Sequence, residues 1–330
     1  MNPYAGFFEQ LSTLRVAVVG DLMLDTYFFG QIDRVSPEAP VPVVAHQRQE
    51  ERIGGAGNVA RNLRALGAQV ELISLVGQDE AAAILQDLLD QAGIGTTLLE
   101  TDPARPTTRK TRVLDQQKQL LRLDQESTQA LDPEKESRWL ARIEAYLRSE
   151  RPQLLILEDY NKGVLSPSMI QSLIRRCQEL HIVTAVDPKK ENFFAYQHVD
   201  LFKPNWREVS EALGFQATPD AERLDHVHHS LTDRLHHQVT LITLSEKGVY
   251  YQTVETAEWL AGHPRQIVDV SGAGDTVIAV AAAAYAITRD AGCMANLANL
   301  AGGLVCEQVG TSPISPDSLL TECRRLGWLG

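Results

Sequence analysis

The chain has 330 residues, of which 44% are hydrophobic and 22% charged, enough for one large α/β core or two smaller ones. Its formal net charge of -12 argues against a general surface for nucleic acid or anionic membranes, so any phosphate would be bound locally by amides and a few cations. The N-terminus lacks a basic signal-peptide region, no apolar run approaches the ~20 residues of a membrane span, and the four cysteines form no CxxC pair. We therefore expect a cytoplasmic chain with reduced thiols and no nucleic-acid or membrane partner.

Strand-like runs alternate with amphipathic helical segments along the chain. The expected strands are residues 15–21, 70–77, 153–159, 182–188, 200–205 and 239–245, and the clearest helices are 58–67, 79–93 and 166–181. This alternation predicts a mainly parallel sheet covered by helices on both faces. Residues 31–46 and 107–124 read as strands without helices between them, and we expect them to form a small antiparallel lid beside the main sheet. No linker or internal repeat divides the chain, so residues 1–330 are expected to form one domain.

Two acidic residues follow the first expected strand. Asp21 and Asp25 lie in VVGDLMLDTY, just after a buried run, which is where open α/β sheets bind their ligands. Their carboxylates would suit sugar hydroxyls, although one of the two can instead cap a turn.

A glycine-rich segment follows at residues 54–67, GGAGNVARNLRALG. Its GAGNVA stretch matches the dinucleotide pattern G-x-G-x-x-[GA], but QRQEERI precedes it in place of a buried strand, so a nicotinamide-dependent oxidoreductase is weakly supported. A turn that brings Asn58 and bare backbone against a polyhydroxylated ligand fits better. The alternative is a plain helix start capped by asparagine.

The segment KPNWREVSEALG places Asn205 and Glu208 three positions apart, on one face of the first turn of a helix. The pair resembles a capping box, which needs no ligand. It could equally orient a hydrated Mg²⁺, which takes few protein ligands and keeps several waters.

Five histidines lie between residues 226 and 237. Two of them could share a helix face and bind zinc, but no cysteine or paired carboxylate completes such a site, so a solvated helix face is the favoured interpretation. The chain also lacks the GxxxxGK[ST] sequence, which excludes a P-loop mechanism.

An acid stands at the last predicted strand-to-helix junction, in IVDVSGAGDTVIAV at residues 267–280. Gly272, Ala273 and Gly274 would let the backbone approach a ligand, and the amides at the helix start favour an anion. Asp275 beside such an anion is explained if it removes a proton from a nucleophile next to a phosphate. Taken alone, it is explained as well by a first-turn acid that complements the helix dipole.

Together these motifs resemble the two signatures of the PfkB (ribokinase-like) carbohydrate kinase family, GGAGNVARNLRALG and DVSGAGDT, and NWRE matches its N-x-x-E motif. GDLMLDTYFFG, RVSPEAPVPVV, TRKTRVLDQQKQLLRLD, EDYNKGVL, VDPK and GTSPISP resemble the branch that acts on D-glycero-β-D-manno-heptose 7-phosphate, also found as one half of bifunctional ADP-heptose synthases. The chain contains no H-x-G-H motif of a nucleotidyltransferase half, so a stand-alone kinase is expected. The resemblance implies a ribokinase-like three-layer α/β sandwich with a mainly parallel sheet and a β lid that often pairs between subunits, hence a homodimer.

The resemblance also implies roles for individual residues. Asp275 would be the catalytic base, and the amides of Gly272, Ala273 and Gly274 would form the anion hole. The residues expected around a sugar phosphate are Asp25, Gly54, Gly55, Asn58, Lys110, Arg112, Asp159 and Lys162, with Arg34 as a further candidate for its phosphate. Those expected around the nucleotide are Asn205, Thr243, Gly248 and Asn299. Asn205 and Glu208 would hold Mg²⁺, largely through water, and Asp269 with the loop 309–312 would hold a monovalent cation such as K⁺.

The implied reaction is transfer of the γ-phosphoryl group of ATP to the anomeric hydroxyl of heptose 7-phosphate, which gives heptose 1,7-bisphosphate, a precursor for lipopolysaccharide. Solvated surface charge is the alternative for each cation near the sugar phosphate. Lys190 and Glu158 stand where these kinases carry glycine and a small residue, so another sugar or nucleoside kinase of the family stays open. A non-catalytic sugar-phosphate binder is a further alternative, but loss of Asp275 or the glycines would be expected for it.

Overall fold

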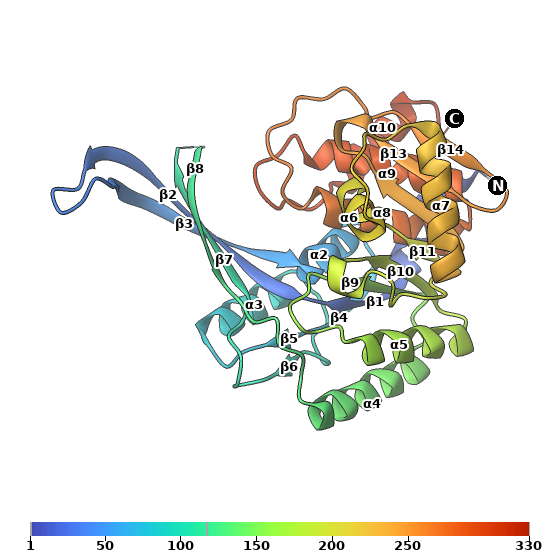
Figure 1. The fold of residues 1–330 in the computed structure, drawn as a ribbon, viewed down its shortest axis with the longest axis horizontal. Helices are drawn as coiled ribbons and strands as arrows, with labels where there is room; N and C mark the ends of the chain where they lie inside the picture. The colour runs from blue at the N-terminus through green and yellow to red at the C-terminus, as the bar shows by residue number, and fades with distance from the viewer. Residues whose placement is uncertain (1, 117, 330) are drawn as a thin grey trace.

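The computed structural model describes residues 2–116 and 118–329, and an eight-stranded sheet runs through its body (Figure 1). The strand order is β14-β13-β12-β11-β10-β9-β1-β4. Neighbours from β4 to β12 pair in parallel, whereas β13 and β14 add an antiparallel edge that the sequence pattern did not predict. The strands are β1 (Arg15–Gly20), β4 (Gln69–Ile73), β9 (Leu154–Glu158), β10 (Val183–Asp187), β11 (Leu201–Phe202), β12 (Val239–Thr243), β13 (Val249–Gln252) and β14 (Ala257–Leu260).

Helices cover both faces of this sheet, so the predicted three-layer arrangement is confirmed (Figure 1). Alternate residues of β9 point to opposite faces, as the pleat requires: Ile156 packs in one apolar core and Leu157 in the other. Among the described residues, no helix has the length and apolar character to cross a membrane. The first core includes α1 (Pro3–Gln10), α2 (Ala56–Ala65), α3 (Glu80–Gln91), α8 (Ala273–Thr288), α9 (Ala291–Val305) and α10 (Pro316–Arg325), and the second includes α4 (Pro133–Glu150), α5 (Pro167–Leu180), α6 (Trp206–Leu213) and α7 (Ala221–Leu235).

Helix α8 is the most deeply enclosed of the helices, because every residue from Asp275 to Tyr285 is buried. Its alanine-rich sequence combines high helix propensity with a narrow profile, which lets α2 and α9 pack closely against it. The first turn of α8 therefore has a fixed position relative to α2, and this positions the site described below.

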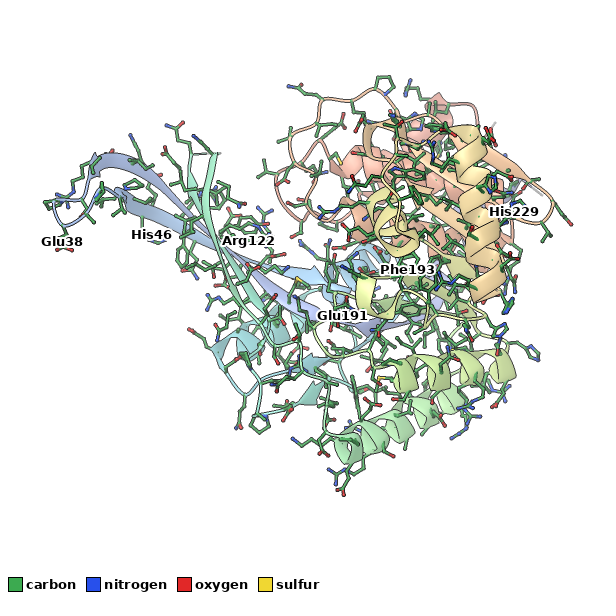
Figure 2. The ribbon with its side chains drawn as sticks, in the orientation of Figure 1. Glu38, His46, Arg122, Glu191, Phe193 and His229 are labelled. Carbon is green, nitrogen blue, oxygen red and sulfur yellow. The ribbon has the colours of Figure 1, made fainter. Side chains whose placement is uncertain are left out.

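The lid is a four-stranded sheet of order β3-β2-β7-β8, formed by β2 (Leu22–Val35), β3 (Pro42–Gly55), β7 (Arg109–Asp115) and β8 (Lys118–Gln125). Its outer hairpin projects from the body, with Glu38 and His46 at its far end (Figure 2). The predicted ranges 31–46 and 107–124 were too short for the first hairpin, because residues 22–29 are almost all buried and read as a continuation of β1. The prediction of a purely antiparallel lid was also wrong, since β2 and β7 pair in parallel.

Residues 267–270 form a loop, so the predicted strand-to-helix junction before α8 was wrong. Ile267, Val268 and Val270 are 58%, 51% and 65% exposed. The amides of Val268 and Asp269 donate to the carbonyl of Cys306, which ties the loop to the end of α9. A β-branched run forms a strand only where a neighbouring strand can pair with it, and here the partner is a single carbonyl.

Candidate active site

The first turn of α8 begins after a residue in the left-handed conformation. Gly272 has φ of 76° and precedes the helix, and a Cβ added there would lie only 2.6 Å from Asn58 Nδ2. Glycine alone tolerates both this conformation and this close approach. The amide of Ala273 donates to the carbonyl of Val270 at 3.2 Å, so this member of the predicted anion hole is already bonded to the preceding loop. The amides of the predicted anion hole lie where a helix start favours an anion.

Asp275, in that first turn, is fully enclosed and accepts two hydrogen bonds. Asn58 Nδ2 donates to Oδ2 and the Tyr160 hydroxyl donates to Oδ1, each at 2.7 Å. Burial raises the pKa of Asp275 to about 6, and these two donors oppose the rise. The carboxylate is thus ionised near neutral pH and basic enough to accept a proton.

The pKa of Asp275 sets the acidic limit of any reaction that uses it as a base, and the Tyr160 hydroxyl lowers that pKa. We expect the rate to fall about tenfold for each pH unit below about 6, because only the ionised carboxylate accepts a proton. Tyr160→Phe removes a donor to the ionised form, so this limit should move to higher pH. A pH–rate profile measures it, with Tyr146→Phe on α4 as the control. An unchanged limit in Tyr160→Phe would contradict the assignment.

Two further acids lie at the carboxyl edge of the sheet beside Asp275. Glu158 and Asp187 end β9 and β10, pair in register, and lie on the same sheet face as Ile156, toward α8. Burial, followed by the charges of Asp187 and Asp275, raises the pKa of Glu158 well above its usual range. Neither oxygen of Glu158 has a hydrogen-bond partner among the described residues. Glu158, which the sequence marked as unusual, is therefore a buried acid with a raised pKa beside the proposed base.

Two lysines balance these acids. Lys203 Nζ lies 2.8 Å from Asp187 Oδ2. Lys189 Nζ lies 2.5 Å from Glu208 Oε1 and 3.5 Å from Asp187 Oδ1. Burial lowers the pKa of Lys189, but the charges of Asp187 and Glu208 outweigh it and the net shift is upward. Both lysines thus pair with carboxylates at the edge of the sheet.

Asn205 and Glu208 form the capping box at the start of α6. Asn205 Oδ1 accepts from the Glu208 amide at 2.9 Å, and Glu208 Oε2 accepts from the Asn205 amide at 2.8 Å. The ligand-free interpretation of this motif is therefore realised. The motif nevertheless adjoins Asp187, whose buried Oδ1 lacks a hydrogen-bond partner in the described part of the chain. Amide and carboxylate oxygens with an unsatisfied acceptor fit a hydrated Mg²⁺.

A cleft of about 450 Å³ opens beside the start of α8. The predicted nucleotide residues Thr243, Gly248 and Asn299 line it together with Ala273 and Gly274. Predicted residues from β12, from the turn before β13, and from α8 and α9 are thereby brought to one cleft. Asn205 reaches the same edge, because it forms a parallel bridge with Thr243.

The predicted sugar residues gather where β2 and β3 leave the body. Asp25 is buried and pairs with Arg112 Nη1 at 2.5 Å. A Cβ on Gly54 would overlap the Asp25 carboxylate, and a Cβ on Gly55 would overlap the Asp21 carbonyl. Residues with a side chain would not fit at these two positions. The glycines end β3, and α2 follows directly, so no turn separates the strand from the helix.

Asp21 has the structural role that the sequence left open between it and Asp25. Its carboxylate accepts the amides of Tyr160, Lys162 and Val164 at 2.7, 3.1 and 3.2 Å. It therefore holds the loop after β9 in place and so positions Tyr160. Asp25 is the acid of this pair that stays a predicted sugar ligand.

The remaining predicted residues divide into two groups. Lys110 lies 5.9 Å over the ring of Tyr160, which contacts Asp275, and Lys162 Nζ pairs with Glu126 at 2.7 Å. Asp159 instead accepts the Tyr196 hydroxyl and the Asn192 amide, at 2.7 and 3.0 Å, and is turned away from the site. Arg34 lies in the exposed outer part of β2.

Asp269 also has protein partners. Burial would raise its pKa, but hydrogen bonds from the Ser271 and Gly310 amides, at 2.9 and 2.8 Å, lower it overall. Asp269 thus joins the loop before α8 to the loop 309–312.

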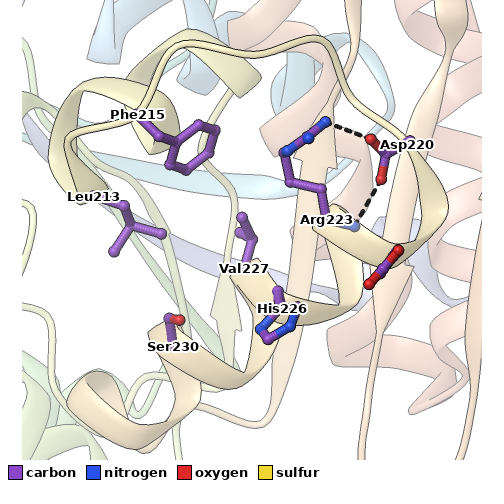
Figure 3. A pocket seen from close by; sticks show the side chains of 8 residues that line it. Leu213, Phe215, Asp220, Arg223, His226, Val227 and Ser230 are labelled. Atoms are coloured by element: carbon purple, nitrogen blue, oxygen red, sulfur yellow. Dashed lines mark hydrogen bonds and ion pairs between the residues drawn. The ribbon is translucent and has the colours of Figure 1, made fainter.

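A separate surface hollow lies between α6 and α7 (Figure 3). Its lining includes Leu213, Phe215 and His226, and Arg223 pairs with Asp220 at its rim. None of the predicted catalytic or binding residues lines it. His228 and His237 are buried around the Thr240 hydroxyl, and no group of three metal-ligating side chains is found in residues 2–116 and 118–329.

The sequence pattern of the "pfkB family carbohydrate kinase" matches residues 13–318. The chain belongs to this family. D-beta-D-heptose 7-phosphate kinase of Bordetella bronchiseptica is 40% identical over 326 residues, which are 98% of this chain and 99% of that protein. Bifunctional protein HldE of Methylobacillus flagellatus is 40% identical over 311 residues, which are 93% of this chain but 62% of that protein. The kinase thus spans less than two thirds of its bifunctional relatives.

Solved structures of PfkB kinases share this fold. Phosphofructokinase-2 from Escherichia coli in complex with potassium gives a TM-score of 0.76 at 17% identity, over 95% of this chain and 99% of that one. The structure of Arabidopsis thaliana ribokinase complexed with ribose and ATP gives a TM-score of 0.70 at 17% identity, over 93% of this chain and 98% of that one. The predicted ribokinase-like fold is confirmed.

Around the candidate site the structure places four further residues that no sequence motif marked: Tyr160, Asp187, Lys189 and Lys203. Each follows the carboxyl end of a parallel strand within two residues or ends it. That position was the available signal, because ligand sites of open α/β sheets lie there.

Proposed function

We propose that this kinase transfers the γ-phosphoryl group of ATP to the anomeric hydroxyl of D-glycero-β-D-manno-heptose 7-phosphate. The observation that carries the proposal is the position of Asp275. Its buried carboxylate lies between the 450 Å³ cleft and the residues on the sugar side, and it is held by Asn58 and Tyr160. A base held between two binding regions suits proton removal from a hydroxyl that attacks a phosphate.

The chain's own residues would act as follows. Asp25 and Asn58 hold sugar hydroxyls, so that the anomeric hydroxyl faces Asp275 Oδ1 or Oδ2 and gives up its proton there. The amides at the start of α8 then stabilise the negative charge on the moving phosphoryl group. Lys189 and Lys203 add positive charge at the same edge of the sheet. Asn205, Glu208 and Asp187 would hold Mg²⁺, which neutralises charge on the phosphate oxygens of ATP.

The 7-phosphate of the acceptor requires cations away from the anion hole. Lys110 is half-buried beside Tyr160, and burial lowers its pKa before nearby acids oppose the effect. A partly desolvated ammonium gains from binding a phosphate. Lys162 can exchange Glu126 for the same ligand. The name of the Bordetella bronchiseptica relative supports this acceptor over ribose or fructose.

The requirement for K⁺ stays a prediction. Asp269 already accepts two amides, and the carbonyls of Val309 and Thr311 accept guanidinium groups of Arg52 and Arg61. No step of the proposed reaction depends on this cation.

A homodimer through the lid is part of the proposal. Leu121 and Leu123 on the edge strand β8 are 51% and 56% exposed and project from one face of the lid, an apolar patch that a second copy would cover. We expect Leu121→Glu with Leu123→Glu to convert a dimer into a monomer in light scattering after size exclusion. Val254→Glu, in the turn between β13 and β14, is the control. A monomeric wild-type chain would contradict the proposed dimer.

A panel of acceptors tests the reaction. ATP consumption should be fast with heptose 7-phosphate and slower with ribose, fructose and their phosphates, and Lys110→Met should raise KM for heptose 7-phosphate more than for an unphosphorylated sugar. Preferred consumption with fructose or ribose would favour another kinase of the family. Binding of a sugar phosphate without ATP turnover would favour the non-catalytic alternative.

A further inference from the structure

A second cavity lies behind the anion hole. It measures about 570 Å³, and its walls are lid strand β3, helices α2 and α3, and the residues 311–312. We call it the rear cavity. It adjoins the site through Thr311, because a Cβ added to Gly272 would lie 3.1 Å from Thr311 Cγ2. Its lining includes Glu50, Glu51, Arg52, Arg61 and Thr311.

The rear cavity contains an arginine without a counter-charge. Among the described residues, Arg61 forms no salt bridge, and its guanidinium donates one hydrogen bond, to the Thr311 carbonyl at 3.3 Å. A guanidinium has five N–H donors, so most of this group is free to bind a ligand. Burial lowers the pKa of Arg61, and the charge of Arg52 lowers it further. Two cations therefore converge in a chain whose net charge is -12.

The two glutamates of the rear cavity do not neutralise Arg61. Glu50 pairs with Arg48 and Arg52, and Glu51 pairs with Arg109 at 3.0 Å. Each carboxylate is thus bound to an arginine of the lid. The free positive charge in the cavity is that of Arg61.

A residue that lines the same cavity carries a buried hydroxyl. Thr311 lines the rear cavity, is only 5% exposed, and its Oγ1 has no hydrogen-bond partner in the described part of the chain. A buried polar atom is normally satisfied, so this hydroxyl points to a missing partner. Together with Arg61 it offers an ionised donor and a neutral donor, a combination that binds phosphate oxygens.

We propose that the rear cavity binds a phosphate-bearing anion through the Arg61 guanidinium and the Thr311 hydroxyl. This ligand is distinct from ATP and the acceptor, and its binding does not require the proposed function to be correct. The loop that carries Thr311 is connected to the anion hole: the Gly310 amide donates to Asp269, which accepts the Ser271 amide. Occupancy of the rear cavity would hold this loop and so change the turnover rate, and substrate binding would change the anion's affinity by the same factor.

Isothermal titration with inorganic phosphate and, separately, glycerol 3-phosphate tests the proposal. The protein is saturated with Mg²⁺ and a non-hydrolysable ATP analogue, which fills the anion hole, and chloride holds the ionic strength constant. We expect wild-type protein to bind at least one of the two probes, and the tighter one identifies the source of the phosphate. Arg61→Met should weaken this binding at least tenfold. Arg64→Met is the matched control, since Arg64 lies on the same helix and donates to Gly93 and Ala68 carbonyls.

Thr311→Val keeps the shape and removes only the hydroxyl, so it provides a second variant if Arg61→Met does not fold. It should also weaken binding of the probe, by a smaller factor than Arg61→Met does. Equal affinities in wild type and both variants would overturn the proposal, as would absence of binding in wild type. The titrations measure binding and not turnover, so failure of this proposal is distinguishable from failure of the proposed kinase reaction.

Discussion

Asp275→Asn is expected to reduce kcat about 10³–10⁴-fold, the upper part of the range for a lost general base. Asparagine keeps the size of the side chain, and its Oδ1 can still accept from Asn58, while its Nδ2 would donate to the Tyr160 oxygen instead of accepting from it. It cannot accept the hydroxyl proton. The affinity for ATP should change little, because the cleft is lined by other residues. Steady-state kinetics and nucleotide titration measure the two quantities.

Asp233→Asn, on the exposed face of α7, is the control for this change. It should leave both kcat and ATP affinity as in the wild type. Near wild-type turnover in Asp275→Asn would show that the proton leaves by another route, and the base assignment would be wrong.

Gly272→Ala is expected to lower both stability and turnover. The left-handed conformation costs alanine about 1–3 kcal/mol of folding free energy, and its Cβ would push the Asn58 amide, 2.6 Å away. Asn58 would then lose its hydrogen bond to Asp275. Misplacing the anion hole should reduce kcat about 10²–10³-fold. Urea unfolding and steady-state kinetics measure the two effects.

Gly274→Ala is the matched change two residues along. A Cβ there meets its nearest atom, Asp187 Oδ2, at 3.8 Å, and alanine within a helix is favoured over glycine by up to about 1 kcal/mol. Stability should therefore be unchanged or higher, whereas KM for ATP should rise because the methyl group enters the cleft. Equal loss of stability in the two variants would refute the close approach at Gly272.

Much of the fold followed from the sequence because its signals are local. The alternation of β-branched runs with amphipathic segments predicted the parallel sheet from β4 to β12 and the helices on both of its faces. The strand predicted at residues 267–270 does not form, because strand formation depends on a neighbouring strand that the local sequence does not encode. The first half of β2 was missed because burial on both sides removed the alternating pattern.

The candidate site was predictable where a motif carries it. The glycine and acid pattern around Asp275 and the Gly54–Asn58 segment led to residues that the structure brings together. Tyr160 reaches Asp275 across 115 positions of sequence, through a loop that Asp21 holds, and no local pattern encodes that contact. Likewise, only the register of β9 and β10 shows that Glu158 and Asp187 are neighbours.

The central claim is that Asp275 deprotonates the anomeric hydroxyl of a sugar phosphate. Phosphorus NMR of the product formed from heptose 7-phosphate and ATP tests it most directly, with wild-type protein and Asp275→Asn side by side. We expect wild-type protein to give a new signal from an anomeric phosphate beside an unchanged 7-phosphate signal, and Asp275→Asn to form the same product and ADP about 10³–10⁴-fold more slowly. A new phosphate on any other carbon, or the same product at the same rate from the variant, would contradict it.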